Sequence, residues 1–182
     1  MSLLTKGNTK VKALLFDLPT DVCAIQCVKC YARKAEIRFP NVLRKRYSNF
    51  IISGNDNFPT LISDEIKKSK YKIVRIHSSG DFYSQVYISK WTIIAKAFPG
   101  IQFYAYTKAK DLFDFSDFEE LENVNIINSI TELGVNYGNE TFCNELVKLG
   151  YTLCPCRKGI HIDCMIDCNI CLTQKQICFI EH

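Results

Sequence analysis

The sequence predicts an α/β fold, an open, partial (β/α) barrel with parallel strands and a C-terminal cysteine-rich extension. Short apolar runs alternate with amphipathic helical segments, the pattern of a parallel sheet with right-handed crossovers. The length of 182 residues suits one sizeable core better than two full domains. A cysteine spacing near the start, C-x3-C-x2-C, recurs near the end. We therefore expect residues 1–153 to form the barrel and residues 154–182 to pack on it within one compact domain.

Five apolar segments have the length and composition of strands. The first is a buried run that ends at Pro19, and a proline commonly marks the limit of a strand. The third is rich in aromatic and β-branched side chains, which favour a pleated surface. About five strand–helix units would make an open barrel. The predicted strands are residues 13–19, 71–77, 101–107, 124–130 and 151–153.

Helical segments lie between these strands. The helix over residues 31–50 is expected to break at Phe39-Pro40, because a residue before proline avoids the α region. Asn41 is a candidate cap for the second piece. We expect residues 51–60 to be a loop, since they carry a glycine and a proline. The remaining predicted helices are residues 61–70, 84–98, 112–123 (weakly helical) and 142–149.

Composition places the chain in a reducing compartment. The first 12 residues are polar and basic, so we expect no signal peptide, and no stretch approaches the roughly 18 apolar residues of a membrane span. We therefore expect a cytoplasmic protein with no membrane partner. The ten cysteines then indicate metal binding more than disulfides. A net charge of +4 does not by itself establish a nucleic-acid partner.

The first cysteine group, Cys23, Cys27 and Cys30, follows the first predicted strand directly. Paired zinc knuckles use C-x2-C twice, whereas cysteine runs of mixed spacing suit the corners of an iron–sulfur cube. Three thiolates would hold three irons of a [4Fe-4S] cluster. The fourth iron would stay open to another protein ligand or to a small molecule.

The second cysteine group supplies a complete set of four thiolates. Four thiolates close a metal site, which suits structure or electron transfer more than catalysis. Zinc is the alternative metal here, and Cys156 could replace the first ligand. We expect Cys143 and Cys178 to be small apolar residues outside both groups. The predicted ligands are Cys154, Cys164, Cys168 and Cys171.

Five further residues are candidates for binding a cofactor at the carboxyl ends of the strands: Arg75, His77, Ser79, Gly80 and Asp81. A glycine there lets the backbone approach a ligand, and Asp81 could accept hydrogen bonds from an ammonium group. The alternative is a simple turn with Asp81 as a helix cap. Arg75 and His77 should share one face of their strand, where Arg75 could bind a carboxylate or phosphate. The alternative is an ion pair for Arg75 and a core position for His77.

The first cysteine group and the Tyr31 after it resemble the cluster-binding loop of radical S-adenosylmethionine enzymes. The resemblance implies a [4Fe-4S] cluster that binds the amino and carboxylate groups of S-adenosylmethionine and cleaves the cofactor to a radical at the barrel mouth. Residues 79–81 stand where that superfamily has a glycine-rich acidic motif. The sequence departs from the pattern by Asp81 in place of Glu, by Lys29 in place of an aromatic residue, and by a barrel of fewer than six units.

A resemblance to the phage gene-product-88-like family covers more of the chain. It rests on residues 30–34 (CYARK), 38–42 (RFPNV), 75–82 (RIHSSGDF), 103–108 (FYAYTK) and the cysteine-rich tail. This resemblance implies a phage-associated iron–sulfur protein, in a family to which no activity is assigned.

The alternative to an enzyme is a non-catalytic iron–sulfur or zinc protein that binds nucleic acid or host machinery. Its sequence basis is a basic stretch from Lys29 to Arg46, in which only Glu36 is acidic. Such a stretch could follow a phosphate backbone, although a solvated helix face has the same composition. The basic residues are Lys29, Arg33, Lys34, Arg38, Arg44, Lys45 and Arg46.

Overall fold

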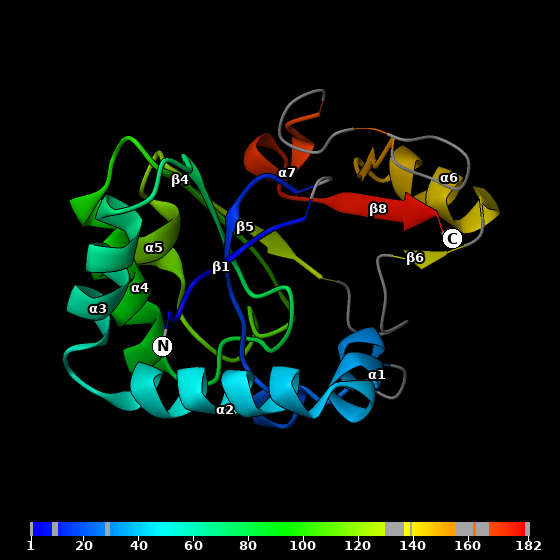
Figure 1. The fold of residues 1–182 in the computed structure, drawn as a ribbon. Helices are drawn as coiled ribbons and strands as arrows, with labels where there is room; N and C mark the ends of the chain where they lie inside the picture. Colours follow the sequence, from blue (N-terminus) through cyan, green and yellow to red (C-terminus); the bar gives the residue numbers. More distant parts are fainter. Residues whose placement is uncertain are drawn as a thin grey trace.

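The computed structural model describes residues 2–8, 11–27, 30–129, 137–138, 140–155, 162 and 168–180. Its centre is a five-stranded sheet in the order β1-β2-β3-β4-β5 (Figure 1). Strands β2 to β5 are parallel to one another, and β1 pairs antiparallel with β2. The strands are β1 (Thr5–Lys6), β2 (Leu14–Phe16), β3 (Ile73–Ile76), β4 (Gln102–Thr107) and β5 (Val124–Asn128).

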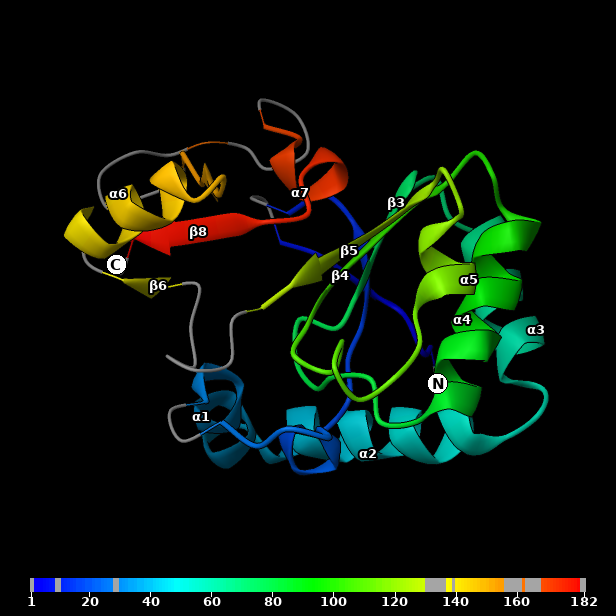
Figure 2. The same cartoon turned by 180° about the vertical axis from the view of Figure 1, so that it is seen from behind.

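Helices pack against one face of this sheet. Side chains of β2 to β5 at alternate positions, among them Phe16, Ile76 and Phe103, are buried there with Phe58 and Trp91 of the helices. Figures 1 and 2 show these helices together on the same side of the sheet. They are α3 (Phe58–Lys67), α4 (Gln85–Ala97) and the short α5 (Ser116–Glu119).

The other face is covered by the C-terminal part of the chain. Tyr104 and Ile127 are buried on this face together with Cys154 and Ile177. The covering elements are α7 (Ile170–Thr173) and β8 (Ile177–Ile180), which lie on the opposite side of the sheet from α4 (Figure 2). The sheet is thus buried on both faces, which explains why its strands read as nearly continuous apolar runs.

Helices α1 (Tyr31–Arg38) and α2 (Pro40–Gly54) lie along the carboxyl edge of the sheet (Figure 1). The amide of Asn49 in α2 donates to the carbonyl of Asp17, directly after β2, at 3.0 Å. The expected break before Pro40 is confirmed, because Phe39 leaves the helical region at φ −128°. Asn41 does not cap the second helix, since Phe39 is its first boundary residue and no side chain caps it.

Two expectations about secondary structure are wrong. Residues 51–60 are mostly helical, because α2 continues to Gly54 and α3 begins at Phe58 with its proline in the first turn, where proline is tolerated. The segment over residues 151–153 does not extend the main sheet. It forms β7 (Thr152–Leu153), which pairs with β8 in a second sheet of order β6-β8-β7, where β6 is Tyr137–Gly138. Helix α6 (Glu140–Lys148) packs against this sheet.

Candidate functional site

The first cysteine loop, residues 20–30, connects β2 to α1 at the carboxyl edge and begins with a 3-10 turn, η1 (Thr20–Val22). The side chain of Gln26 holds the loop together from inside. Its amide nitrogen donates to the carbonyls of Thr20, Asp21 and Cys23 at 2.9 to 3.3 Å. Its amide oxygen accepts a hydrogen bond from Arg33 of α1 at 2.9 Å. Residues 20–26 of the loop are thus held by hydrogen bonds within the protein itself.

A buried ion pair anchors the start of this loop to the helices. Glu36 accepts hydrogen bonds from the Thr20 backbone at 3.0 Å and from its hydroxyl at 2.5 Å. The same carboxylate pairs with Arg46 of α2 at 2.9 Å, and both side chains are nearly buried. Arg46 therefore does not belong to an outward basic face, as its place in the basic stretch suggested. Its charge is used internally, where it stabilises Glu36.

The loop that follows β3 is fixed by Asp17. The Asp17 carboxylate accepts hydrogen bonds from the backbone and hydroxyl of Ser78, both at 2.7 Å, and from the backbone of Ser79 at 3.1 Å. The Ser79 carbonyl in turn accepts from the Leu18 backbone at 3.0 Å. Since Asp17 and Leu18 directly precede the cysteine loop, these bonds fix the two loops relative to each other.

Gly80 sits where this loop crosses close to Leu18. Its φ is +84°, and a Cβ added there would lie 2.5 Å from the Cβ of Leu18. Only glycine combines that backbone conformation with so close an approach. The sequence suggested that the backbone at Gly80 approaches a ligand. In the structure this backbone approaches Leu18 of the same chain.

Asp81 lies under this loop with only 7% of its surface exposed. Its carboxylate accepts hydrogen bonds from the Thr107 hydroxyl at 2.6 Å, the Phe82 backbone at 2.7 Å and the Lys108 backbone at 2.9 Å. Burial raises the pKa of Asp81, and these three hydrogen bonds oppose that shift. A carboxylate has about four acceptor positions, so one more donor could be accommodated. The expected contact of Asp81 with an ammonium group stays a prediction.

Lys108 connects the ends of β3 and β4 with the cysteine loop. Its backbone N–H donates to Asp81, and its ammonium group lies 3.1 Å from the sulfur of Cys27. A lysine at this position would offset the negative charge of a sulfur that binds a metal. The structure thus places a lysine from the end of β4 against Cys27, one of the predicted ligands.

The three cysteines of the first loop are partly buried. Burial, with the negative charge of Asp81 and the neighbouring Cys27 and Cys30, raises the pKa of Cys23 to about 12. Among the described residues, no group of three or more His, Cys, Asp or Glu side chains converges closely enough to hold a single metal ion. The iron–sulfur cluster expected on these cysteines therefore stays a prediction.

Arg75 and His77 lie on opposite faces of the sheet, so the expectation that they share a face is wrong. His77 has a φ of +66°, which ends β3 and turns its ring to the helix-covered face. There its Nε2 lies 2.9 Å from the Tyr87 hydroxyl, and burial lowers the pKa of His77 to about 3. Arg75 lies on the other face, over the rings of Tyr104 and Tyr106. His77 is thus a core residue, the alternative that the sequence left open.

The second cysteine group lies behind the sheet, on the face that the C-terminal elements cover. Cys154 and Cys171 belong to the same apolar cluster as Tyr104. The Cys171 sulfur is 2.9 Å from the Tyr106 hydroxyl. Cys168 is partly buried and lies two residues before the start of α7. The fourth predicted ligand, Cys164, and its neighbour Cys156 lie outside the described residues. The structure thus brings two of the four predicted ligands into one cluster.

Cys143 and Cys178 form a separate buried pair between α6 and β8. Neither side chain is exposed, and the two pack with Leu146 in a small apolar cluster. The Cys143 thiol donates to the carbonyl of Phe179 at 3.2 Å. Both cysteines are thus buried in the apolar interior, as the sequence predicted.

Three residues that hold the site were not predicted: Asp17, Gln26 and Glu36. Asp17 is the one acidic residue within an apolar run, a signal that could have indicated a buried acceptor. Glu36 is the one acid within a basic stretch, which could have indicated an internal ion pair. No comparable signal marked Gln26.

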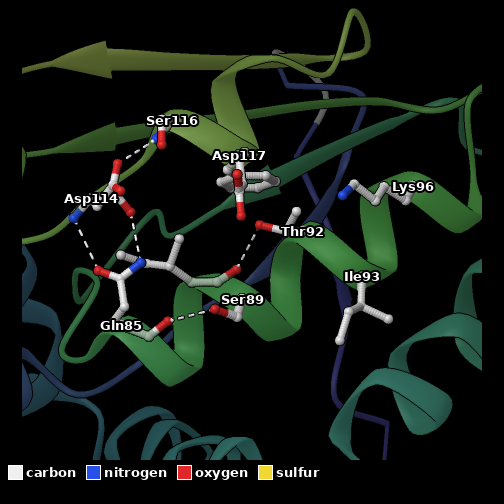
Figure 3. A pocket seen from close by; sticks show the side chains of 10 residues that line it. Gln85, Ser89, Thr92, Ile93, Lys96, Asp114, Ser116 and Asp117 are labelled. Carbon is white, nitrogen blue, oxygen red and sulfur yellow. Dashed lines mark hydrogen bonds between the residues drawn. The ribbon is translucent and has the colours of Figure 1, made fainter.

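A pocket between α4 and α5 lies away from all of these residues (Figure 3). It measures about 190 Å³, and Gln85 closes one end by exchanging two hydrogen bonds with the backbone of Asp114. Its lining includes Lys96 and Asp117 but no cysteine. We assign no function to this pocket, because its polar groups serve to attach the α5 segment to α4.

The fold and the site define a mixed α/β protein whose parallel sheet carries a cysteine loop, held by buried acids, at its carboxyl edge. No helix within the described residues has the length and apolarity that crossing a membrane requires. The chain belongs to the Gene product 88 family, whose family model matches residues 2–144. That match includes the first cysteine loop and ends before the second cysteine group. No solved structure matches the chain.

Two relatives are proteins of mycobacteriophages. The Gene 88 protein of Mycobacterium phage D29 is 32% identical over 65 residues, which cover 36% of this chain and 27% of that protein. The Gene 88 protein of Mycobacterium phage L5 is 27% identical over 115 residues, 54% of this chain and 46% of that protein. The chain thus matches less than half the length of each relative. The resemblance to a phage family that the sequence motifs suggested is confirmed.

Proposed function

We propose that the carboxyl edge of the sheet is an iron–sulfur site with an open coordination position, as in radical S-adenosylmethionine enzymes. One observation carries the proposal: Lys108, at the end of β4, contacts both Asp81 and the sulfur of Cys27. It brings together a three-cysteine loop and a glycine–aspartate loop from three successive parallel strands. The open, four-stranded parallel arrangement supports a partial barrel, whose inner face would carry Arg75.

Each group at this edge has a role in the proposed site. Cys23, Cys27 and Cys30 would hold three corners of a [4Fe-4S] cluster. When bound, such a cluster supplies one electron to the S-adenosylmethionine at its open iron. Lys108 would offset negative charge at Cys27, and Asp81 would accept a hydrogen bond from the amino group of the cofactor. The hydrogen bonds of Gln26 fix the conformation of residues 20–26 of the loop, so that binding of the cluster need not order this part of the loop.

The second cysteine group would hold another cluster, closed by four thiolates. Cys154 and Cys171 already share one apolar cluster, and the predicted partners are Cys164 and Cys168. Tyr106 is a hydrogen-bond partner for Cys171 and would tune the centre by bonding to its sulfur. Zinc on the same four thiolates is the competing occupant.

The decisive experiment is iron and sulfide analysis of anaerobically prepared protein, with EPR of the reduced form. About eight irons and a signal that shifts on addition of S-adenosylmethionine would support both centres and the open position. The C23S/C27S/C30S variant should lose about four irons and the shift, whereas the control C143S should lose neither. Zinc without iron in the wild-type protein, or a full iron complement in the triple variant, would overturn the proposal.

A second candidate function is nucleic-acid binding by the outer face of α1 and α2. The two helices carry six basic residues and one acid, Glu36, whose charge is paired internally with Arg46. The outward charges of these helices are therefore all positive. Aromatic side chains lie among them, with Tyr31 64% exposed and Phe39 50% exposed. Cations interspersed with exposed rings suit a single strand, whose phosphates and bases they would contact.

The structure also selects the variants for testing this candidate. Arg46 is buried, and Lys45 donates to the Ser2 carbonyl, so neither is a clean probe. R38Q/R44Q neutralises two exposed cations, and K96Q on α4 is the matched control. Anisotropy titrations with a labelled oligonucleotide should show about tenfold weaker binding for the double variant and a salt slope reduced by about 1.4. Equal affinity of R38Q/R44Q and wild type would exclude this face.

A further inference from the structure

A second, larger hollow lies at the amino-terminal edge of the sheet, opposite the cysteine loop. Its volume is about 600 Å³, within the range of sites for small organic ligands. It opens between Gly7, Asn8 and Lys12 on one side and the segment that leads into β3 on the other. The described residues that line it are Gly7, Asn8, Lys12, Lys70, Tyr71, Lys72 and Ile73.

The charged residues that line this hollow, among those described, are all basic. Lys12, Lys70 and Lys72 line it with exposed side chains, and no acidic residue is among the described lining residues. The pocket between α4 and α5 differs, since its one cation, Lys96, is accompanied by two aspartates. Three lysines that line one hollow create a positive field, which attracts a multiply charged anion.

The walls of the hollow are held by internal bonds. The Gly7 backbone donates to the Ala13 carbonyl at 2.8 Å, and the Asn8 side chain accepts from the Val11 backbone at 2.9 Å. A Cβ added at Gly7 would lie 1.9 Å from the Val11 carbonyl oxygen, so the chain is tightly folded there. On the opposite wall, the ring of Tyr71 packs against the main core. A preformed wall lowers the entropic cost of binding.

We propose that this hollow binds a nucleoside di- or triphosphate. The phosphates would contact the three ammonium groups, and the sugar and base would lie against Tyr71 and Ile73, the apolar part of the lining. The three lysines line a single hollow of about 600 Å³, a space that fits a compact anion. This inference is independent of the iron–sulfur proposal, because the two sites lie at opposite ends of the strands.

Isothermal titration calorimetry with ATP, ADP, pyrophosphate and adenosine tests the assignment. ATP and ADP should bind, pyrophosphate more weakly, and adenosine at least about tenfold more weakly than ATP, because it lacks the phosphates. K70Q/K72Q should weaken ATP binding by about tenfold or more, and K12Q should weaken it less. The matched control is K96Q, which removes a cation from the other pocket and should leave ATP binding unchanged.

Three outcomes would overturn the inference. They are no ATP binding at millimolar concentration, binding unaffected by K70Q/K72Q, and binding of oligonucleotides alone. Circular dichroism of K70Q/K72Q verifies its folding, and these lysines are exposed, so the variant should fold. Iron content of the same variant should equal that of the wild type. A failure here therefore leaves the proposal for the cysteine loop standing, and the converse also holds.

Discussion

The ammonium group of Lys108 lies 3.1 Å from the sulfur of Cys27, although the two residues are 81 positions apart in the sequence. The contact forms because β2 and β4 end at the same edge of a parallel sheet. Through its backbone, Lys108 also fixes Asp81 at 2.9 Å. One residue thus couples the ends of three strands at the proposed cluster.

Replacing Lys108 with methionine should weaken iron binding by the first cysteine loop. The variant loses a hydrogen bond to a charged group, an interaction that contributes about 1.5–3 kcal/mol. A lower chelator concentration should then remove half of the loop's iron. K108R retains the charge and should stay close to wild type. If K108M and K108R retain iron equally well, the cation at Cys27 has no role in holding the cluster.

Asp17→Ala should destabilise the fold although it removes no apolar surface. The carboxylate accepts bonds from Ser78 and Ser79, and its removal leaves their N–H groups without this acceptor. We expect a loss of about 2–3 kcal/mol in the free energy of unfolding, measured by urea denaturation. D64A, at an exposed ion pair with Lys67, should change it by less than about 0.5 kcal/mol. A D17A variant as stable as D64A would show that the two loops do not depend on this carboxylate.

The sequence predicted the four parallel strands because burial on both faces makes each a nearly continuous apolar run. The helix after β3 was equally clear, and Ser84 caps it by accepting from the Tyr87 backbone at 3.2 Å. The break between α1 and α2 followed from the steric effect of Pro40 on Phe39. These features depend on local chemistry, which a single sequence carries.

The wrong predictions concern features that depend on contacts between residues distant in the sequence or on one backbone angle. The periodicity of a strand placed Arg75 and His77 on the same face, but a positive φ at His77 reversed its side chain. Nothing local distinguishes β7 as a strand of a second sheet, since its partner β8 follows 24 residues later. The contacts of Asp17 with Ser78 and Ser79 likewise arise only once β2 and β3 have aligned.

Gly80→Ala should be among the most destabilising single-methyl additions in the chain. The new Cβ would lie 2.5 Å from that of Leu18, in a backbone conformation of φ +84°. Strain at such a position typically costs about 1–3 kcal/mol before the steric overlap is added. Gly54→Ala is the matched control, because nothing lies within 4 Å of its added Cβ at the end of α2. G54A should be neutral or stabilise by up to about 1 kcal/mol. Thermal melts that rank the two variants equally would contradict the close approach at Gly80.

His77 should make the protein less stable as the pH falls from 7 to 5. Burial lowers the pKa of His77 to about 3, below its ordinary value of 6.5, so the folded protein keeps the ring neutral across this range. The unfolded chain binds the proton instead, and the free energy of unfolding therefore decreases with falling pH. For one group with these pKa values, the loss between pH 7 and pH 5 is about 2 kcal/mol.

His77→Asn isolates this effect, because asparagine tolerates the positive φ of this position and does not titrate. Urea denaturation of both proteins at pH 7, 6 and 5 gives the difference in free energy of unfolding at each pH. The raised pKa of Asp81 contributes a pH dependence of opposite sign, but it is present in both proteins and cancels in the difference. The wild type should lose about 2 kcal/mol relative to the variant between pH 7 and pH 5. A constant difference would mean that the folded protein protonates His77 as readily as the unfolded chain does, and that the ring is not enclosed beside Tyr87.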